Sequence, residues 1–519
     1  MKKAAILILV LALVFSLAAC GADKGSTDAP AAENAGAEPA AEAKTDAAAP
    51  TNLTVGIVGE PNTLDPEQGG GIIGVYESLF GNDADKNLVM KLATGYEWED
   101  DNTLVIHLRE GVKFHDGNDF TASDVLFSLK VCEQNPQMSN RVANIDVENS
   151  EIRDDYTVAL KTYEYSAVQI NYLCTVIMLD QEWCNDFTDE MDQKCNGTGP
   201  YVFKEWKMGD RIILERNEEY WGDKAGFETV NIVYFNDPST AFMEFETGNL
   251  DVVEVQNAED VAVMESGAVD GYMETVLTHH VTVISMGQLT GDTFANENLR
   301  QAIAHAIDVN TMITTICGDM AIPATSLIPS DDKNHIDVPF EYDPDLAREY
   351  LETYKQETGA ESVSLHMILD NEGYNPDIAE AMQAYLAEVG IDMTIETCMK
   401  FDLIPRMIAG EVEFTLNSIG GGADTNDMFA ALERGSGNTV AEFTDDTLCE
   451  LIVKGQTAKD EAERTEIYKQ IQQLNYDGAW TIPLYEPQTH YAARNEFQGV
   501  CADAVSGENL NIPAIYYAG

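Results

Sequence analysis

A cysteine at position 20 stands where a lipid-attachment reaction is expected. It follows Leu17-Ala18-Ala19 and precedes Gly21, at the end of an apolar run over residues 4–19 that begins after Lys2-Lys3. A basic start, a short apolar stretch and small residues before a cysteine are typical of a secretory signal with a lipoprotein cleavage site. We therefore predict a signal peptide over residues 1–20 and an acyl anchor on the Cys20 thiol. The alternative is an ordinary cleaved signal with an unmodified cysteine.

Patterns that indicate catalysis are absent from the sequence. It contains no Gly-x-Ser-x-Gly, no His-Glu-x-x-His and no nucleotide-binding fingerprint. His279 and His280 are adjacent, and neighbouring side chains of a strand point to opposite faces, so we do not expect them to share a metal ion. We predict a protein that is not an enzyme and holds no cofactor or metal.

The eight cysteines after Cys20 show no zinc-binding spacing and no Cys-x-x-Cys pair. Export permits disulfides, and Cys184 and Cys195 are the closest pair in sequence. A chain long enough for its own core more often keeps buried free thiols, so we predict at most one disulfide bridge. The eight are Cys132, Cys174, Cys184, Cys195, Cys317, Cys398, Cys449 and Cys501.

Acidic residues outnumber basic residues by 90 to 30, which gives a formal net charge of −60. This charge repels phosphate backbones and anionic lipid head groups, so we predict that the protein does not bind nucleic acid. The same field modestly favours cationic or zwitterionic solutes, and an acidic surface is equally typical of a soluble extracellular protein.

Residues 21–50 differ in composition from the rest of the chain. They are rich in alanine, acids, glycine and proline, and they contain no aromatic or large aliphatic side chain. Such a segment cannot bury a core. We predict a disordered, acidic, alanine-rich tether over residues 21–50 and a folded part from Thr51 onward that is long enough for two or three lobes.

Short β-rich segments alternate with amphipathic helical segments, which predicts an α/β fold. Thr121 is a good N-cap for one helix, with Asp124 in its first turn. Gly390 is expected to end another helix. The expected strands cover 53–58, 104–108, 113–117 (strand and turn), 211–215, 230–234, 250–253 and 391–395; further helices cover 239–247, 298–307 and 378–389.

The glycine-rich piece Gly197-Thr198-Gly199-Pro200-Tyr201 is not expected to bind phosphate. It lacks the Gly-Lys-Ser/Thr ending of a phosphate loop and a following helix. We predict a tight chain crossing between lobes, with φ angles that only glycine reaches easily.

The order and spacing of several segments resemble the extracytoplasmic solute-binding proteins of peptide and nickel type, which feed ABC importers. The resemblance covers residues 51–519 and implies a two-lobe periplasmic-binding-protein-like fold of type II, with a large extra subdomain and a ligand cleft between the lobes. The segments that carry it are 64–66, 75–80, 111–117 leading to 121–125, 197–201, 216–217 with 220–222, and 298–303 with 306–308.

The resemblance also implies a division of the folded part. The first lobe is expected from residues 51–76, 197–286 and 488–519, and residues 77–196 are expected to form its inserted subdomain. The second lobe is expected from residues 287–487.

Two carboxylates match positions that contact the ligand in peptide-binding relatives. Glu60 follows the first strand, and Asp424 matches the aspartate that pairs with the α-ammonium of a bound peptide. The alternative for Asp424 is a solvated loop acid beside the glycines. Relatives often place a tryptophan just before this aspartate, whereas this chain has glycines, among them Gly421 and Gly422, which would leave space or let backbone amides approach the ligand.

Three further residues are candidates for ligand contacts. Arg406 is expected to meet a substrate carboxylate with two hydrogen bonds. Tyr76 and Tyr485 are expected to pack against the ligand. For all three, an ordinary place on the surface or in the core is the alternative.

The resemblance implies a substrate-binding lipoprotein that captures a small solute by lobe closure and delivers it to the permease subunits of an ABC importer. We expect an oligopeptide or dipeptide as the ligand, and a monomer anchored through Cys20 outside the cytoplasm, on the outer face of the cell membrane. The acidic spacer favours a bacterium with a single membrane. Alternatives are a binding protein for an oligosaccharide or a nickel complex, with His490 as the late histidine candidate, and a sensor or adhesion lipoprotein without transport.

Overall fold

The computed structural model describes residues 50–65, 74–83, 86–135, 138–186, 194–289, 291–420, 422, 424–503 and 509–519. The predicted signal peptide, Cys20 and the predicted tether up to residue 49 lie outside these residues. The described residues form one compact unit. Within the described residues, no helix is both long and apolar enough to span a bilayer.

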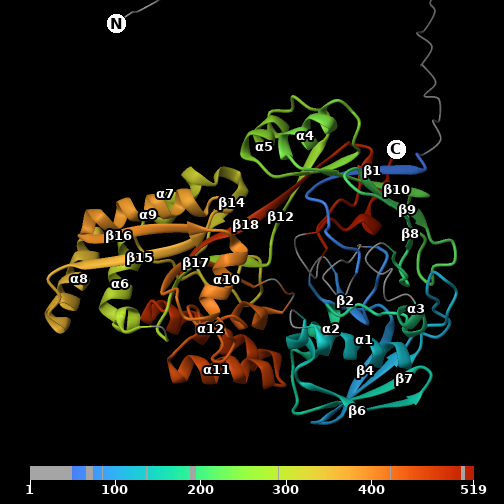
Figure 1. Cartoon of the computed structure of the whole chain (residues 1–519), viewed down its shortest axis with the longest axis horizontal. Helices are drawn as coiled ribbons and strands as arrows, with labels where there is room; N and C mark the ends of the chain where they lie inside the picture. Colours follow the sequence, from blue (N-terminus) through green and yellow to red (C-terminus); the bar gives the residue numbers. More distant parts are fainter. Residues whose placement is uncertain are drawn as a thin grey trace, which may run out of the picture. The chain divides into compact units, whose positions relative to one another are not determined.

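A ten-stranded sheet runs through this unit (Figure 1). Strand β1 pairs in parallel with β10 on one side and β11 on the other, and the other strand pairs of the sheet are antiparallel. Leu53 and Val55 of β1 are fully buried, as the alternating pattern predicts. The order is β17 (Phe414–Gly420), β13 (His280–Met286), β18 (Thr481–Ala493), β11 (Val252–Val255), β1 (Asn52–Val58), β10 (Thr229–Phe235), β9 (Arg211–Arg216) and β8 (Tyr201–Lys207), and β12 (Tyr272–Leu277) and β14 (Ala321–Pro323) also pair with β18.

Strand β18 connects the two halves of this sheet. Residues 481–487 pair with β13 and β14, whereas residues 488–493 pair with β12 and β11. The change of partners follows Pro487, a residue that has no backbone N–H to donate. Strands β12 and β13 are separated only by Thr278 and His279, so two chain connections between the halves lie beside one another (Figure 1).

A four-stranded antiparallel sheet and three helices surround a separate core. Helix α1 begins after Thr121, whose side chain and that of Asp124 form the reciprocal bonds of a capping box, in agreement with the predicted cap. The sheet has the order β4 (Ala93–Asp100), β5 (Thr103–Leu108), β7 (Thr157–Thr162) and β6 (Ile145–Asp154); the hairpin β2 (Phe80–Asn82) and β3 (Leu88–Met90) and the helices α1 (Ala122–Gln134), α2 (Gln169–Cys174) and α3 (Gln181–Asp186) complete this part.

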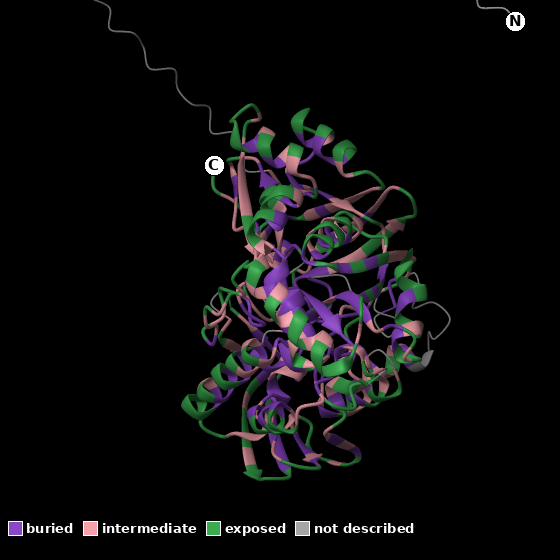
Figure 2. Ribbon diagram, turned by 90° about the vertical axis from the view of Figure 1, so that its left-hand side faces the viewer, coloured by how far each residue is buried: buried purple, intermediate pink, exposed green. Residues whose placement is uncertain are grey.

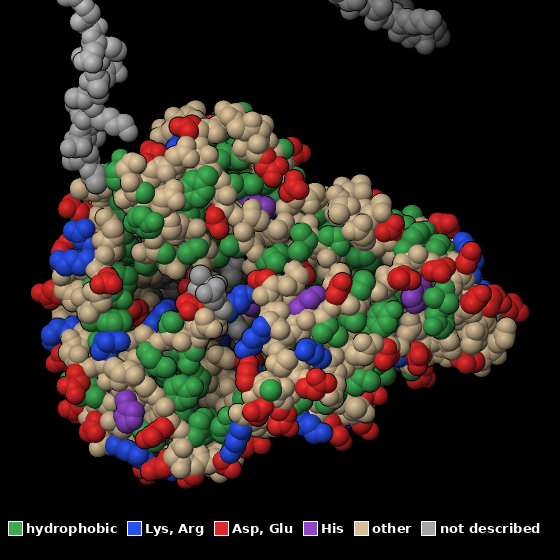
Figure 3. All heavy atoms as spheres, turned by 180° about the vertical axis from the view of Figure 1, so that it is seen from behind, with side chains coloured by type: hydrophobic (Ala, Val, Ile, Leu, Met, Phe, Trp, Pro, Cys, Tyr) green, Lys and Arg blue, Asp and Glu red, His purple; other side chains and the backbone are tan. Residues whose placement is uncertain are grey.

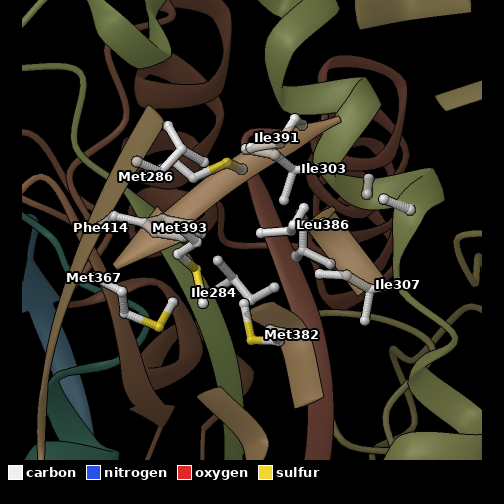
Figure 4. Packing of buried hydrophobic residues seen from close by; sticks show 14 of the residues in the cluster. Ile284, Met286, Ile303, Ile307, Met367, Met382, Leu386, Ile391, Met393 and Phe414 are labelled. Atoms are coloured by element: carbon white, nitrogen blue, oxygen red, sulfur yellow. The ribbon is translucent and has the colours of Figure 1, made fainter. Parts of the chain in front are cut away.

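The largest core lies in the half that contains β13 and β17 (Figure 4). Ile284 and Met286 of β13 pack there with Ile303, Leu386 and Phe414. Figure 2 shows largely buried strands near the middle of the unit and helices that expose one side. The elements around this core are α6 (Glu297–Ala306), α7 (Val309–Ile316), α8 (Pro344–Thr358), β15 (Val363–Asp370), α9 (Asn375–Val389) and β16 (Ile391–Cys398).

Smaller clusters hold the remaining elements. Helices α11 and α12 pack on one cluster, and α4 and α5 pack on another. The bounds are α4 (Pro238–Glu246), α5 (Ala258–Glu265), α10 (Lys400–Ile408), α11 (Asp446–Thr457), α12 (Glu461–Gly478), β19 (Phe497–Gln498) and β20 (Tyr516–Tyr517).

Two local predictions differ from the structure. Residues 113–117 form no strand, because the chain turns at once and leaves only an isolated bridge between Lys113 and Asp119. Gly197 and Gly199 do not adopt positive φ angles. They are needed for close approach instead, since a Cβ atom on Gly197 would lie 2.1 Å from the Val75 carbonyl oxygen.

Several other predictions are confirmed. Gly390 ends α9 in the left-handed conformation, with φ of 95°. The predicted strand at 250–253 lies two residues later, as β11. All eight cysteines of the described residues are free thiols, four of them buried.

Candidate ligand-binding site

A cleft opens where β18 changes partners. It consists of a cavity of about 790 Å³ and an adjoining cavity of about 620 Å³. Both volumes lie in the range of small-molecule sites. The two cavities are neighbours, since five residues line both of them: Glu254, Gln256, Pro487, Gln488 and Thr489.

The smaller cavity lies at the carboxyl ends of the parallel strands β1, β10 and β11, where α/β sheets commonly bind ligands. Gly59 turns the chain after β1 with φ of 89°, and Glu60 follows at the rim. The Glu60 carboxylate accepts hydrogen bonds from Trp206 Nε1 at 2.7 Å and from the Gly209 backbone at 2.8 Å. These bonds fix the carboxylate beside the cavity that it lines.

The larger cavity has a mostly apolar wall. It is lined by Ile404 and Ile408 of α10, by Leu416 of β17 and by the rings of Tyr374 and Tyr485. Burial raises the pKa of Tyr485 to about 12, so its ring carries a neutral hydroxyl at physiological pH. This wall is suited to an apolar group of a ligand.

Carboxylates outnumber cations around the larger cavity. Among its described lining residues, Glu254, Asp370 and Glu372 are acidic, and Lys400 is the one lysine or arginine. Lys400 lies 3.5 Å from Glu372, which partly neutralises it. Acidic side chains are also common outside the cavity: on the face shown in Figure 3 they are spread over the surface and do not gather in one patch. The cleft therefore favours neutral or cationic ligands over anionic ones.

Of the predicted ligand contacts, Glu60 and Tyr485 line the cleft. Tyr76 is a core residue, 8% exposed, in the cluster that contains Leu53. Gly421 lies outside the described residues. A Cβ atom on Gly422 would lie 1.9 Å from an oxygen of Asp427, so this glycine permits a close contact within the protein.

Asp424 lies in a buried network of the protein's own groups. Nη2 of Arg464, on α12, donates to both carboxylate oxygens at 2.8 and 3.0 Å. Nδ2 of Asn171, on α2, donates to Oδ2 at 2.5 Å, and the Asn426 backbone N–H donates to Oδ1 at 2.8 Å. Asp424 is absent from the described lining of both cavities. In the structure, the cation that pairs with the Asp424 carboxylate is Arg464 of the protein itself. A contact between Asp424 and a solute stays a prediction.

Asp427 lies next to this network. Its side chain accepts a hydrogen bond from the Asp424 backbone at 3.2 Å, which completes a reciprocal cap on the short 3₁₀ helix Thr425–Phe429. Desolvation, together with the nearby charge of Asp424, raises the pKa of Asp427 to about 7. The sequence did not point to this residue, since an acid in a loop, three residues after Asp424, is usually solvated.

Arg406 also has partners within the protein. Its Nη1 lies 2.7 Å from Glu396 Oε1, and its Nε lies 3.7 Å from a Glu411 oxygen. It is not among the described residues that line the cleft, although its neighbour Met407 is. Its contact with a substrate carboxylate stays a prediction, and both of its present partners are acids of the protein, Glu396 on β16 and Glu411 after α10.

The histidines do not assemble into a metal site among the described residues. His490 is buried, and its two ring nitrogens lie 2.8 Å from the Thr275 hydroxyl and 2.9 Å from the Asp319 carbonyl oxygen. Burial lowers its pKa, which favours the neutral ring. Both nitrogens are thus engaged by the protein.

The main feature that sequence reasoning missed is α10. Phe401, Ile404 and Ile408 lie on one face of this helix, and their exposed fractions are 83%, 47% and 62%. The signal in the sequence was the largely apolar run from Met399 to Ile408. At helical spacing, its apolar residues fall on both the buried and the exposed side of a helix. The acid Glu254, at the end of β11, was also overlooked.

The chain is similar to known proteins in sequence and in fold. The oligopeptide-binding protein AppA of Bacillus subtilis is 24% identical over an alignment of 543 positions, which covers 96% of each chain. The structure of this AppA in complex with a nonapeptide superimposes with a TM-score of 0.72 and 21% identity, covering 91% of this chain and 99% of that one. Helicobacter pylori DppA, an ABC transporter-associated periplasmic binding protein in complex with the peptide STSA, gives a TM-score of 0.75 and 23% identity over 91% and 99% of the two chains.

These likenesses confirm the predicted type of fold. The sequence profile described as "Bacterial extracellular solute-binding proteins, family 5 Middle" matches residues 87–441, more than half of the chain. The described residues within this range include α10, β17 and residues 370–375, which together contribute half of the residues that line the larger cavity. The chain belongs to the bacterial extracellular solute-binding proteins of family 5.

Proposed function

We propose that this protein captures a peptide in the cleft and delivers it to the permease of an ABC importer, without making or breaking a covalent bond. The observation that carries the proposal is the pair of neighbouring cavities, of which one is lined by β1 and β11 and the other by β11, α10 and β17. The peptide-binding names of the relatives support the ligand class.

Two lobes, joined at β18 and at the β12–β13 connection, form the basis of the proposed mechanism. We assign residues 77–196 to a subdomain of the first lobe, as predicted. We place β13 in the second lobe, because Ile284 and Met286 pack in its core, so that the chain crosses near Thr278 and His279. Ligand contacts from both sides would favour the closed arrangement, which the permease would recognise.

The location of the protein follows from its predicted amino-terminal segments. An acyl chain on Cys20 and the tether over 21–50 would hold a monomeric binding unit near the importer, on the outer face of the cell membrane. Tethering raises the local concentration of the captured solute without new contacts. A single-membrane bacterium would gain most from this arrangement, because a free binding protein would diffuse away.

Thermal unfolding in the presence of candidate ligands tests the proposal. The purified protein is screened against di- to pentapeptides, amino acids, oligosaccharides and nickel complexes. A ligand present at 100 times its Kd stabilises the folded state by about 2.7 kcal/mol, which a melting curve detects. Stabilisation by peptides supports the proposal, whereas stabilisation only by a sugar or a nickel complex contradicts it.

A further inference from the structure

Helix α10 exposes an unusual amount of apolar surface next to the cleft. Leu403 and Met407 pack in a small core, as expected for an amphipathic helix, and both also border the larger cavity. On the other side, Phe401, Ile404 and Ile408 are spaced three and four residues apart and remain exposed. Clustered exposed apolar side chains beside a cavity usually mark a binding surface.

The exposed side of α10 continues into the larger cavity. Ile404 and Ile408 line this cavity, and Tyr374 and Tyr485 add their rings to the same lining. A bulky apolar side chain placed here would remove apolar area from water on both partners. A small polar side chain would leave the isoleucines exposed and gain nothing from them.

The Asp424 carboxylate is not available to the α-ammonium group of a peptide, because groups of the protein already bind it. A carboxylate has about four acceptor positions, and Asp424 uses four hydrogen bonds from the protein: two from Arg464, one from Asn171 and one from the Asn426 backbone. Arg464 already provides the positive charge that an α-ammonium would bring. The side chains of Asp424 and Arg464 are only 7% and 10% exposed, so a ligand would have to displace a buried ion pair.

We propose that the cleft selects peptides through a bulky apolar side chain, which lies against Ile404 and Ile408 of α10, and that a free α-ammonium is not required. This inference rests on the proposed function, since it specifies which peptides the same cleft binds. In this proposal Asp424 has a structural role, since it binds Asn171 on α2 and Arg464 on α12. The apolar side chains of α10 determine which peptides bind.

Matched peptides test both parts on the unaltered protein. Calorimetric titration compares Ala-Leu-Ala with Ala-Ser-Ala, and Ala-Leu-Ala with its N-acetylated form; the same pairs are extended with alanines to five residues. We expect the serine peptide to bind about tenfold more weakly than the leucine peptide, and acetylation to change affinity by less than threefold. Leucine and serine peptides of equal affinity, or a loss of more than threefold on acetylation, would overturn the inference.

A double variant locates the preference on α10. In Ile404→Ser/Ile408→Ser, the difference between the leucine and serine peptides should fall to less than threefold. Met243→Ser is the matched control, because Met243 is an exposed apolar residue (59%) on α4 and lines neither cavity. Circular dichroism melts check that both variants fold. An unchanged leucine preference in the folded double variant contradicts the role of α10.

The outcomes separate this inference from the proposed function. If no peptide of any length binds while another solute does, the proposed function fails. If peptides bind but ignore the apolar side chain, or need a free amino end, only the specificity inference fails.

Discussion

Replacing Asp427 with asparagine should stabilise the protein at neutral and alkaline pH but not in acid. Desolvation, followed by the charge of Asp424, raises the pKa of Asp427 from 3.8 to about 7, although the charges of Arg141 and Arg464 act to lower it. An acid with a raised pKa in the folded state holds its proton there while the unfolded chain has already lost it. Folding stability therefore falls as pH rises from about 4 to about 7.

The size of this effect follows from the two pKa values. A pKa difference of about 3 corresponds to ~4 kcal/mol, since one pKa unit is about 1.36 kcal/mol. Asparagine keeps an oxygen that can accept the bond from the Asp424 backbone, yet it cannot ionise. At pH 8 the variant should be more stable than the native protein by up to ~4 kcal/mol, and at pH 4 the two should be equal.

Thermal melts from pH 4 to pH 8 measure this difference. For a cooperative unit of about 470 residues, the entropy of unfolding is ~1 kcal/mol per degree, so the melting temperature of Asp427→Asn should exceed the native value by up to ~4 °C at pH 8. Asp392→Asn, a change of an exposed acid on β16, is the control for the loss of one negative charge. An Asp427→Asn difference that is the same at pH 4 and pH 8 would refute the reasoning.

Three further predictions concern the ion pair, the glycine crossing and the anchor. Arg464→Met leaves the Asp424 carboxylate buried without its cation and should destabilise the protein by about 3–5 kcal/mol in denaturant titrations, whereas an equal or higher stability would contradict the proposed role of the pair. Gly199→Ala places a Cβ atom 2.4 Å from the Gly74 carbonyl oxygen and should lower the folding stability by about 1–3 kcal/mol or more. The control Gly95→Ala meets no atom within 4 Å and should lower it much less. Equal losses of stability in denaturant titrations would show that the backbone shifts to make room at Gly199. Cys20→Ser should release the protein into the medium and impair uptake while leaving the Kd for the ligand unchanged, and continued fractionation with membranes would contradict lipid attachment at this residue.

Local features of the fold were predictable because neighbouring residues determine them. The cap at Thr121 and Asp124, the left-handed end of α9 at Gly390 and the alternating burial of β1 depend on a few consecutive side chains. The segment at 197–201 was correctly recognised as special, but the reason was wrong. Its glycines are required by the backbone at Gly74 and Val75, more than a hundred residues earlier, which no local pattern reveals.

The candidate site was only partly predictable for the same reason. Glu60 and Tyr485 line the cleft, and both follow or lie within recognisable strands. Asp424 was assigned by its position in the chain, but its environment depends on Arg464 in α12 and on Asn171 in α2, which lie 40 and 253 residues away. Whether a carboxylate faces a ligand or an internal arginine is decided by such distant contacts.

The position of β18 in the chain constrains when the protein can fold. This strand, residues 481–493, lies inside the ten-stranded sheet, and its partners β11, β12, β13 and β14 were all synthesised at least 150 residues earlier. The sheet cannot be completed until almost the whole chain is available, and pairing over such sequence distances is slow. A chain that must pass a membrane unfolded would benefit, because its final structure forms only on the far side.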